Sequence, residues 1–223
     1  MTPQQKGFLL VALAIAFAVL TAAVAAGSLD ATDHAVAVAL QGLYRPVLQV
    51  PAQAVALLGG AEVTFGLAAV LFAFLWQAGY RIQSAAVGVY VLAVGLEELY
   101  KFVVFHPAPG GRLSHPDGPS LTSLLEGSGG GNSFPSGHVL RAVVVYGLAA
   151  FVVYRLALSE RRGALAIAGA ALIILVLSFD RLFLEVHWLT DVAGALLLGG
   201  ALLLAAMLWL DFSPLLLRRN KKS

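Results

Sequence analysis

Three polar stretches with residue types suited to phosphate chemistry interrupt a chain that is otherwise rich in leucine, alanine and valine. The first is "LEELYKFVVFHPAP" (96–109), in which Lys101 follows Glu97 by four residues and Glu98 by three. On a helix this spacing puts the three side chains on one face. The lysine is therefore expected either to form an intrahelical ion pair or to bind an anionic ligand.

The second stretch is "NSFPSGHVLRA" (132–142), which directly precedes a long apolar segment. Ser136 and Gly137 stand where that segment would begin a helix. The free backbone N–H groups of a helix N-terminus, together with the helix dipole, bind anions. His138, in the first turn, can donate a hydrogen bond to such an anion. The competing interpretation is an ordinary serine helix cap followed by a surface histidine.

The third stretch is "SFDRLFLEVHWLTDVAG" (178–194), which contains Arg181, His187 and Asp191. His187 and Asp191 are four residues apart, so on a helix the carboxylate can contact the imidazole. A carboxylate on one ring nitrogen fixes the tautomer and leaves the other nitrogen free to attack an electrophile. Alone, such a pair also arises by chance in many helices.

Together the three stretches supply two cations, backbone donors, a donor histidine and a histidine backed by an acid. That set matches phosphoryl transfer through a covalent phosphohistidine, in which cations and N–H groups neutralise the phosphoryl oxygens. No metal and no other cofactor is expected, because lysine, arginine and amide groups carry the positive charge. The remaining histidines, His34, His106 and His115, show no ligand-like spacing with carboxylates and are interpreted as surface or loop residues.

The composition indicates a membrane protein. Of 223 residues, 60% are hydrophobic and only 12% are charged. The absence of cysteine excludes disulfides and thiolate metal sites. The net charge of +2 is small and the basic residues are scattered, which argues against a nucleic-acid partner.

A helix needs about 20 apolar residues to cross a hydrocarbon core of about 30 Å. Six stretches satisfy or approach this length, which predicts an all-α polytopic fold and one domain over residues 1–223. The six spans are Gly7–Ala26, Ala61–Ala78, Ser84–Phe105, Val139–Leu158, Ala164–Phe183 and Val192–Leu210.

Two further segments bear on this layout. Ala35–Leu58 is apolar but interrupted by polar residues and prolines, so we expect it to form an interfacial helix after the first span. The first span ends in small residues that suit signal cleavage. Its apolar run exceeds the about 7–15 residues of a signal core, which favours an uncleaved anchor.

Basic residues are distributed unevenly between the two ends of the expected bundle. One side receives Lys6, Arg81, Arg155, Arg161, Arg162, Arg218, Arg219, Lys221 and Lys222, and the other receives Arg45, Lys101, Arg112, Arg141 and Arg181. The positive-inside rule then predicts a multi-pass protein of the cytoplasmic membrane with both termini in the cytoplasm. The three polar stretches are expected on the extracytoplasmic side.

The three stretches resemble the signature motifs of the type 2 phosphatidic acid phosphatase superfamily of integral-membrane lipid phosphate phosphatases. The family pattern is Lys-x6-Arg-Pro, then Pro-Ser-Gly-His, then Ser-Arg-x5-His-x3-Asp. The chain's "FPSGH" matches the second motif completely. Arg181, His187 and Asp191 match the third motif at the right spacing, and the six spans also fit the family's layout.

The resemblance implies roles for the matching residues. His187 would be the nucleophile, Asp191 its partner and His138 the general acid. The remaining positions, implied to bind the phosphate, are Lys101, Ser136, Gly137 and Arg181.

Two positions depart from the family pattern. Ala108 stands where the first motif has arginine, and Asp180 stands where the third motif has serine. A lost guanidinium removes a strong, charge-assisted contact to phosphate. Arg112 or Arg141 could substitute for it, and Asp180 could divert the neighbouring Arg181 from the phosphate.

We therefore expect an enzyme that dephosphorylates a membrane lipid phosphate or diphosphate. Undecaprenyl diphosphate is the favoured substrate, with phosphatidylglycerophosphate and phosphatidate as alternatives. Two other functions stay open: a degenerate member that binds or transports lipid phosphate without hydrolysis, and a phosphotransferase with an alcohol acceptor. The sequence does not specify the oligomeric state.

Overall fold

The computed structural model describes residues 1–109, 131–157 and 159–212. The described part is helical, with one isolated β-bridge between Pro107 and Asn132. Several residues of interest lie outside the described residues: Arg112, His115, Leu158, Arg218, Arg219, Lys221 and Lys222.

Six helical segments in the described residues are long and apolar enough to cross a membrane, which confirms the predicted all-α polytopic fold. The six long helices are α1 (Pro3–Ala25), α4 (Ala61–Gln77), α6 (Gly88–Val103), α8 (Gly137–Leu156), α9 (Glu160–Phe183) and α10 (Leu189–Phe212). A short helix, α5 (Arg81–Ser84), and a 3₁₀ turn, Ala85–Val87, lead into α6. The predicted spans agree with these helices to within a few residues at most ends.

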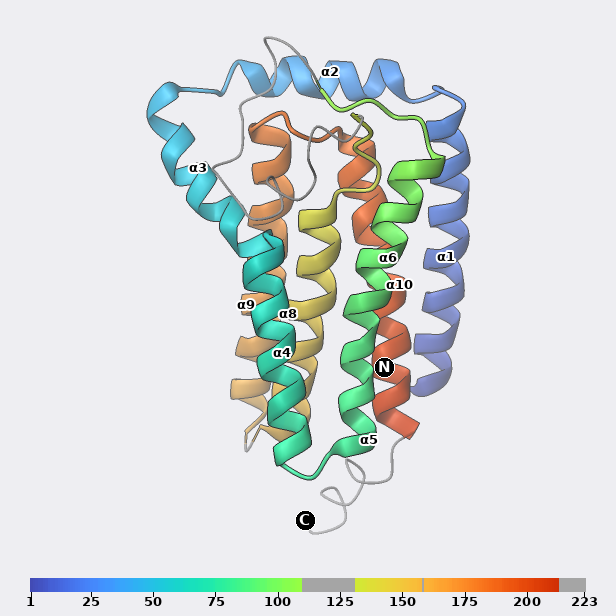
Figure 1. Cartoon of the computed structure of the whole chain (residues 1–223), viewed down its shortest axis with the longest axis vertical. Coiled ribbons are helices and arrows are strands. Elements are labelled where there is room, and N and C mark those ends of the chain that lie inside the picture. Colours follow the sequence, from blue (N-terminus) through green and yellow to red (C-terminus); the bar gives the residue numbers. More distant parts are fainter. Residues whose placement is uncertain (110–130, 158, 213–223) are drawn as a thin grey trace.

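The interfacial helix lies across one end of the bundle, as Figure 1 shows for α2 (Asp30–Gln41). The boundaries predicted for it, Ala35–Leu58, were wrong at both ends. Helix α2 ends at Gln41. Pro46 then keeps the preceding residue, Arg45, in an extended conformation with φ −138° and ψ 134°, which separates α2 from the helical segment that follows. The chain then descends through α3 (Gln49–Ala56), flanked by two 3₁₀ turns, into α4.

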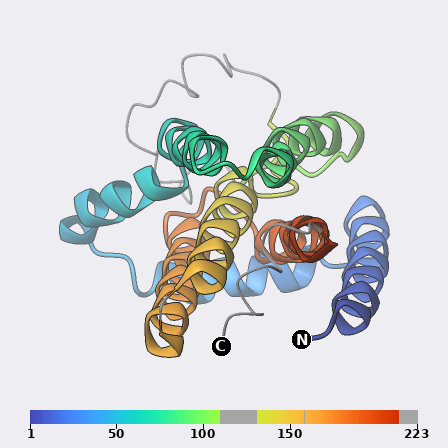
Figure 2. The same cartoon turned by 90° about the horizontal axis from the view of Figure 1, so that it is seen from below.

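Helix α8 forms the centre of the bundle. It packs against α4, α6, α9 and α10, and most of its residues are buried (Figure 2). Large apolar side chains stay exposed on the peripheral helices, for example Phe8, Phe65 and Leu172. A helix that is apolar on its outer face as well suits a lipid environment.

Helix α1 is an integral part of this bundle. It packs along α10, and the buried Lys6 forms an ion pair with Asp211 near the end of α10. Arg155 of α8 pairs with the same carboxylate at 2.6 Å. This three-residue cluster joins three helices at the end of the bundle away from α2.

The three polar stretches meet at the end of the bundle that α2 covers (Figure 1). Helix α6 ends there, α8 begins there, and α9 connects to α10 there. Two backbone hydrogen bonds join the stretches: Ser133 N–H donates to the His106 carbonyl at 2.8 Å, and Ser136 N–H donates to the Asp191 carbonyl at 3.1 Å.

Candidate active site

His187 and Asp191 form the expected pair at the start of α10. His187 Nδ1 lies 3.3 Å from Asp191 Oδ2, and the Trp188 N–H donates to the same oxygen at 2.9 Å. Asp191 is fully buried, whereas His187 is partly exposed. Because Nδ1 faces the carboxylate, Nε2 is the ring nitrogen available to an electrophile.

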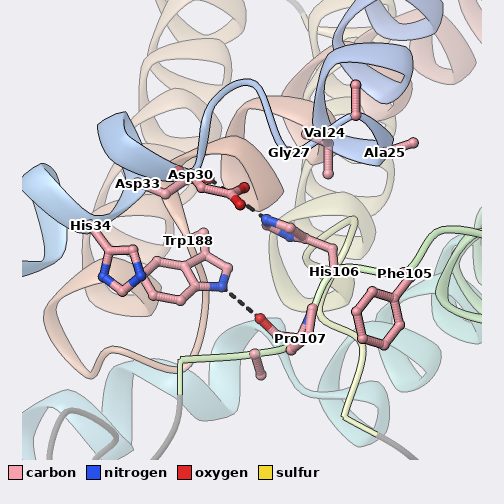
Figure 3. A pocket seen from close by; sticks show the side chains of 12 residues that line it. Val24, Ala25, Gly27, Asp30, Asp33, His34, Phe105, His106, Pro107 and Trp188 are labelled. Atoms are coloured by element: carbon pink, nitrogen blue, oxygen red, sulfur yellow. Dashed lines mark hydrogen bonds and ion pairs between the residues drawn. The ribbon is translucent and has the colours of Figure 1, made fainter.

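A second histidine contacts the same carboxylate. His106 was predicted to be a surface or loop residue. It does lie in the loop after α6, but it is only 6% exposed, and its Nδ1 lies 2.9 Å from Asp191 Oδ1. Its Nε2 lies 3.7 Å from Asp33 Oδ2, an ion pair drawn in Figure 3. The sequence did not reveal this contact because Asp191 is 85 residues away, so no local spacing points to it.

The two carboxylates set the charge of His106. Burial alone would lower the pKa of this imidazole, but the hydrogen bonds and charges of Asp191 and Asp33 outweigh burial and raise the pKa to about 9. His106 is therefore an imidazolium at neutral pH.

The segment that carries His106 is held on both sides by hydrogen bonds. The His106 N–H donates to Asn132 Oδ1 at 3.1 Å. The Trp188 indole N–H donates to the Pro107 carbonyl at 2.7 Å, as Figure 3 shows. These bonds attach the end of the first stretch to the beginning of the second and to the residue next to His187.

A cavity of about 470 Å³ opens beside His106 (Figure 3). Its lining includes Asp30, Asp33 and His34 of α2, and Trp188 lies beside His34. His34 is exposed, as predicted, and its ring packs against Trp188 with centroids 5.0 Å apart. Among the described residues, no group of three His, Asp or Glu side chains is arranged to hold a metal ion.

The start of α8 differs from an ordinary serine cap. Ser136 occupies the N-cap position and is fully buried, yet its hydroxyl makes no capping hydrogen bond. The hydroxyl oxygen has no hydrogen-bond partner within the described residues. Because buried polar atoms are almost always paired, this hydroxyl indicates a place for a polar ligand.

Glu97 of α6 lies against Gly137 and holds two cations. Its carboxylate, fully buried, accepts from Lys101 Nζ at 2.7 Å and from Arg141 at 2.7 Å. Glu98 is farther from the lysine, at 3.8 Å. The intrahelical ion pair expected for Lys101 is therefore present, and Glu97 joins it to the first turns of α8. Sequence reasoning named Glu97 only as a neighbour of Lys101.

Of the two arginines that could replace the one missing at Ala108, Arg141 lies in the part of the chain that the structure describes. It is buried, and besides Glu97 it approaches the Gly59 carbonyl with Nε at 3.5 Å. The His138 side chain also packs on Gly59, where an added Cβ would lie 3.0 Å from His138 Cβ. The 3₁₀ turn before α4 thus supports both residues.

His138 lies among the cationic groups of the site. The side chains whose charges act on its ring belong to all three stretches: Arg181, Arg141, His187 and Lys101. The structure therefore brings the residues singled out in the sequence into one cluster at one end of the bundle. Such clustering of ionisable groups within membrane spans is costly and is typical of functional sites.

Asp180 engages Arg181 directly. The Arg181 guanidinium donates to Asp180 Oδ2 through NH2 at 2.5 Å and through Nε at 3.2 Å, and both side chains are buried. The predicted competition between Asp180 and a phosphate for this arginine therefore has a structural basis.

Glu185 is an unexpected residue close to His187. Its carboxyl group is buried, and neither oxygen has a hydrogen-bond partner in the described part of the chain. Burial raises the pKa of this carboxyl. Its backbone adopts φ 53°, the left-handed region that strains a residue with a Cβ.

Fold and site together define a multi-pass α-helical membrane protein with a cationic cluster around a His–Asp pair. The PAP2 superfamily model matches residues 84–214, more than half of the chain, so the protein belongs to the PAP2 superfamily. This membership confirms the family resemblance and supports a phosphatase acting in a membrane. A search of curated protein sequences gave no significant match.

A solved structure shares the fold. It is the crystal structure of the first transmembrane PAP2 type phosphatidylglycerolphosphate phosphatase from Bacillus subtilis. The two structures superpose with a TM-score of 0.75 at 22% sequence identity, covering 90% of this chain and 94% of that chain.

Proposed function

We propose that the protein, acting as one domain, removes phosphate from a membrane lipid phosphate or diphosphate through a phosphohistidine on His187. The observation that carries this proposal is the contact between His187 Nδ1 and Asp191, which leaves Nε2 available to attack. His187, Lys101, Arg141 and Arg181 all act electrostatically on the ring of His138, the proposed general acid. A non-hydrolytic lipid carrier has no need of a histidine oriented by an acid.

The reaction has two steps. In the first, His187 Nε2 attacks phosphorus, a P–N bond forms, and the P–O bond to the lipid breaks while His138 donates a proton to the leaving oxygen. In the second, His138 takes a proton from water as the water attacks phosphorus, and the P–N bond breaks. Phosphate leaves, and both histidines return to their starting states.

The positive groups of the site neutralise the phosphoryl oxygens. Lys101 and Arg181 supply cations, and Ser136 and Gly137 supply the hydroxyl and the backbone donors at the start of α8. Arg141, held in place by Glu97, supplies the cation that Ala108 lacks. Lysine, arginine and amide donors thus perform the role that a metal ion has in other phosphoryl transfer enzymes, so we expect metal-independent activity.

Phosphatidylglycerophosphate is the first substrate to test, because the solved structure of similar fold is described as a phosphatidylglycerolphosphate phosphatase. Undecaprenyl diphosphate and phosphatidate complete the panel. The site lies at the end of the bundle that α2 covers. The Lys6–Asp211 pair joins the start of α1 to the end of α10, at the opposite end of these helices. With the basic loops in the cytoplasm, the site would face the extracytoplasmic side of the cytoplasmic membrane.

The test is phosphate release from each lipid by purified protein in detergent, with and without EDTA. We expect release that EDTA does not reduce, and its loss in His187→Ala and His138→Ala. His34→Ala is the matched control, because His34 is exposed in the neighbouring cavity without contacting Asp191. Full activity of His187→Ala would refute the mechanism.

Two outcomes distinguish the other functions. Tight binding of lipid phosphate with no release over many hours would indicate a binding or transport protein. Transfer of the phosphoryl group to an added lipid or sugar alcohol, identified by product analysis, would indicate a phosphotransferase.

A further inference from the structure

We propose that His106 is a positioning residue for the phosphoryl transfer. Its imidazole contacts the same Asp191 carboxylate as His187, holds that carboxylate in its orientation and offsets part of its negative charge. This inference rests on the proposed function, because it assigns His106 a role in the attack by His187.

The geometry around Asp191 supports the orienting role. Each carboxylate oxygen has its own donors: Oδ1 faces His106 Nδ1 at 2.9 Å, and Oδ2 faces His187 Nδ1 at 3.3 Å and the Trp188 N–H at 2.9 Å. The carboxylate cannot rotate without losing contacts on both sides. Removing His106 would leave Oδ1 of a buried carboxylate without its histidine donor, a costly state that favours reorientation.

His106 is itself fixed from the opposite side. Asp33 of α2 lies 3.7 Å from His106 Nε2 and also accepts from the Thr190 N–H at 3.0 Å and the Thr190 hydroxyl at 2.7 Å. Thr190 belongs to the first turn of α10, directly before Asp191. The interfacial helix is thereby attached to the same turn that carries the catalytic carboxylate.

The charge argument follows from the groups that face His106. Asp191 faces it from α10 and Asp33 from α2, while Asp30 and His34 of α2 line the adjoining cavity. A lone buried carboxylate strongly favours the protonated form of a neighbouring histidine. A protonated His187 has no free Nε2 lone pair and cannot attack phosphorus. The positive His106 offsets part of the Asp191 charge and thus keeps His187 available as a nucleophile.

Two variants separate orientation from charge. His106→Asn keeps a neutral N–H donor near the position of Nδ1, whereas His106→Ala removes donor and charge together. A merely structural role for His106 would lower the amount of folded protein but would leave the pH–rate profile of the folded fraction unchanged.

The experiment measures kcat and KM against pH for wild type, both His106 variants and the His34→Ala control, on the lipid that gives the fastest release. We expect His106→Ala to lower kcat about 100-fold, the effect of a small misplacement of a catalytic group, with KM nearly unchanged. His106→Asn should recover part of kcat. The acid limb of the pH–rate profile of His106→Asn should shift to higher pH, because Asp191 then holds a proton on His187 more strongly. His34→Ala should behave as wild type.

Folded His106→Ala with wild-type kcat and pH profile would overturn the inference. If that variant does not fold, His106→Asn decides: an unshifted acid limb rejects the charge role. A wild-type protein that releases phosphate from none of the lipids refutes the proposed function, whereas an active wild type with unaltered His106 variants refutes only the role of His106.

Discussion

The Glu97 carboxylate packs so closely on Gly137 that an added Cβ at position 137 would lie 1.8 Å from Glu97 Oε1, so any larger residue there requires the Glu97 side chain to move. The contact places a buried carboxylate beside the N-terminus of α8, where the helix dipole favours negative charge. Lys101 and Arg141 hold the same carboxylate. The Glu97 carboxylate and the proposed phosphate therefore interact with the same positive groups: Lys101, Arg141 and the N-terminus of α8.

Gly137→Ala should abolish most of the activity. The added methyl group overlaps the Glu97 carboxylate, which must then move together with the cations that it holds. We expect at least about a 100-fold loss of phosphate release and a lower Tm. The matched control is Gly95→Ala on α6, where an added Cβ meets nothing within 4 Å. A Gly137→Ala protein with wild-type release and Tm would contradict the packing described for this contact.

Glu97→Gln should destabilise the protein and make its stability depend on phosphate. The substitution keeps the shape but removes the charge between Lys101 and Arg141, and breaking a buried ion pair costs about 3–5 kcal/mol. Added phosphate should raise the Tm of this variant more than that of wild type, because it replaces the missing anion. Glu98→Gln is the control, since the Glu98 side chain is 59% exposed. Equal phosphate effects on all three proteins would argue against a shared anion site.

Asp180→Ser should strengthen phosphate binding while lowering stability. It removes the carboxylate that now pairs with Arg181, so the positive charge of the buried guanidinium loses this negative partner. Competitive inhibition by inorganic phosphate reports the first effect, and Tm in detergent reports the second. We expect an inhibition constant several-fold below that of wild type. Unchanged inhibition would show that Asp180 does not compete with phosphate for this arginine.

Glu185→Gln should remove a pH-dependent loss of stability. Burial raises the pKa of Glu185 above its ordinary value of 4.5. Below pH 4.5 the carboxyl is protonated in both the folded and the unfolded chain, so it does not affect stability. As pH rises from there through the raised pKa, the unfolded chain ionises this group more readily than the folded one, and stability falls. The variant should exceed wild type in Tm at neutral pH, and the difference should vanish at acidic pH. A difference that is the same at both pH values would point to packing rather than ionisation.

Asp211→Asn should weaken the opposite end of the bundle without slowing catalysis. Lys6 and Arg155 both pair with the Asp211 carboxylate. Without its negative charge, the buried Lys6 and the partly buried Arg155 both lose this ion pair. We expect a lower Tm with kcat close to wild type, because the site lies at the other end of the helices. A large loss of kcat in folded protein would indicate coupling between the two ends.

Much of the architecture was predictable because a membrane imposes strong local rules. In lipid every backbone polar group must be satisfied within the chain, so long apolar runs become helices. The spans over 61–78 and 164–183 follow this rule to within a few residues of α4 and α9. The interfacial helix was less predictable, because the apolar pattern continues past residue 41 although α2 ends there, and the Tyr-Arg-Pro at 44–46 separates it from the next helical segment.

The sequence alone determined the six helices and the local pairs of the site: His187 with Asp191, and Lys101 with Glu97, each four residues apart in the chain. The Lys101–Glu97 pair follows from the helical periodicity of α6. His187 lies in the bend just before α10 and contacts Asp191 in the first turn of that helix, so its pairing follows from closeness in the chain. Only the tertiary structure decided which partners meet across helices: His106 with Asp191, Glu97 with Gly137 and Arg141, and Asp33 with Thr190. These contacts join residues 40 to 157 positions apart in the chain. Their formation depends on how whole helices pack, and no spacing along the chain encodes that packing.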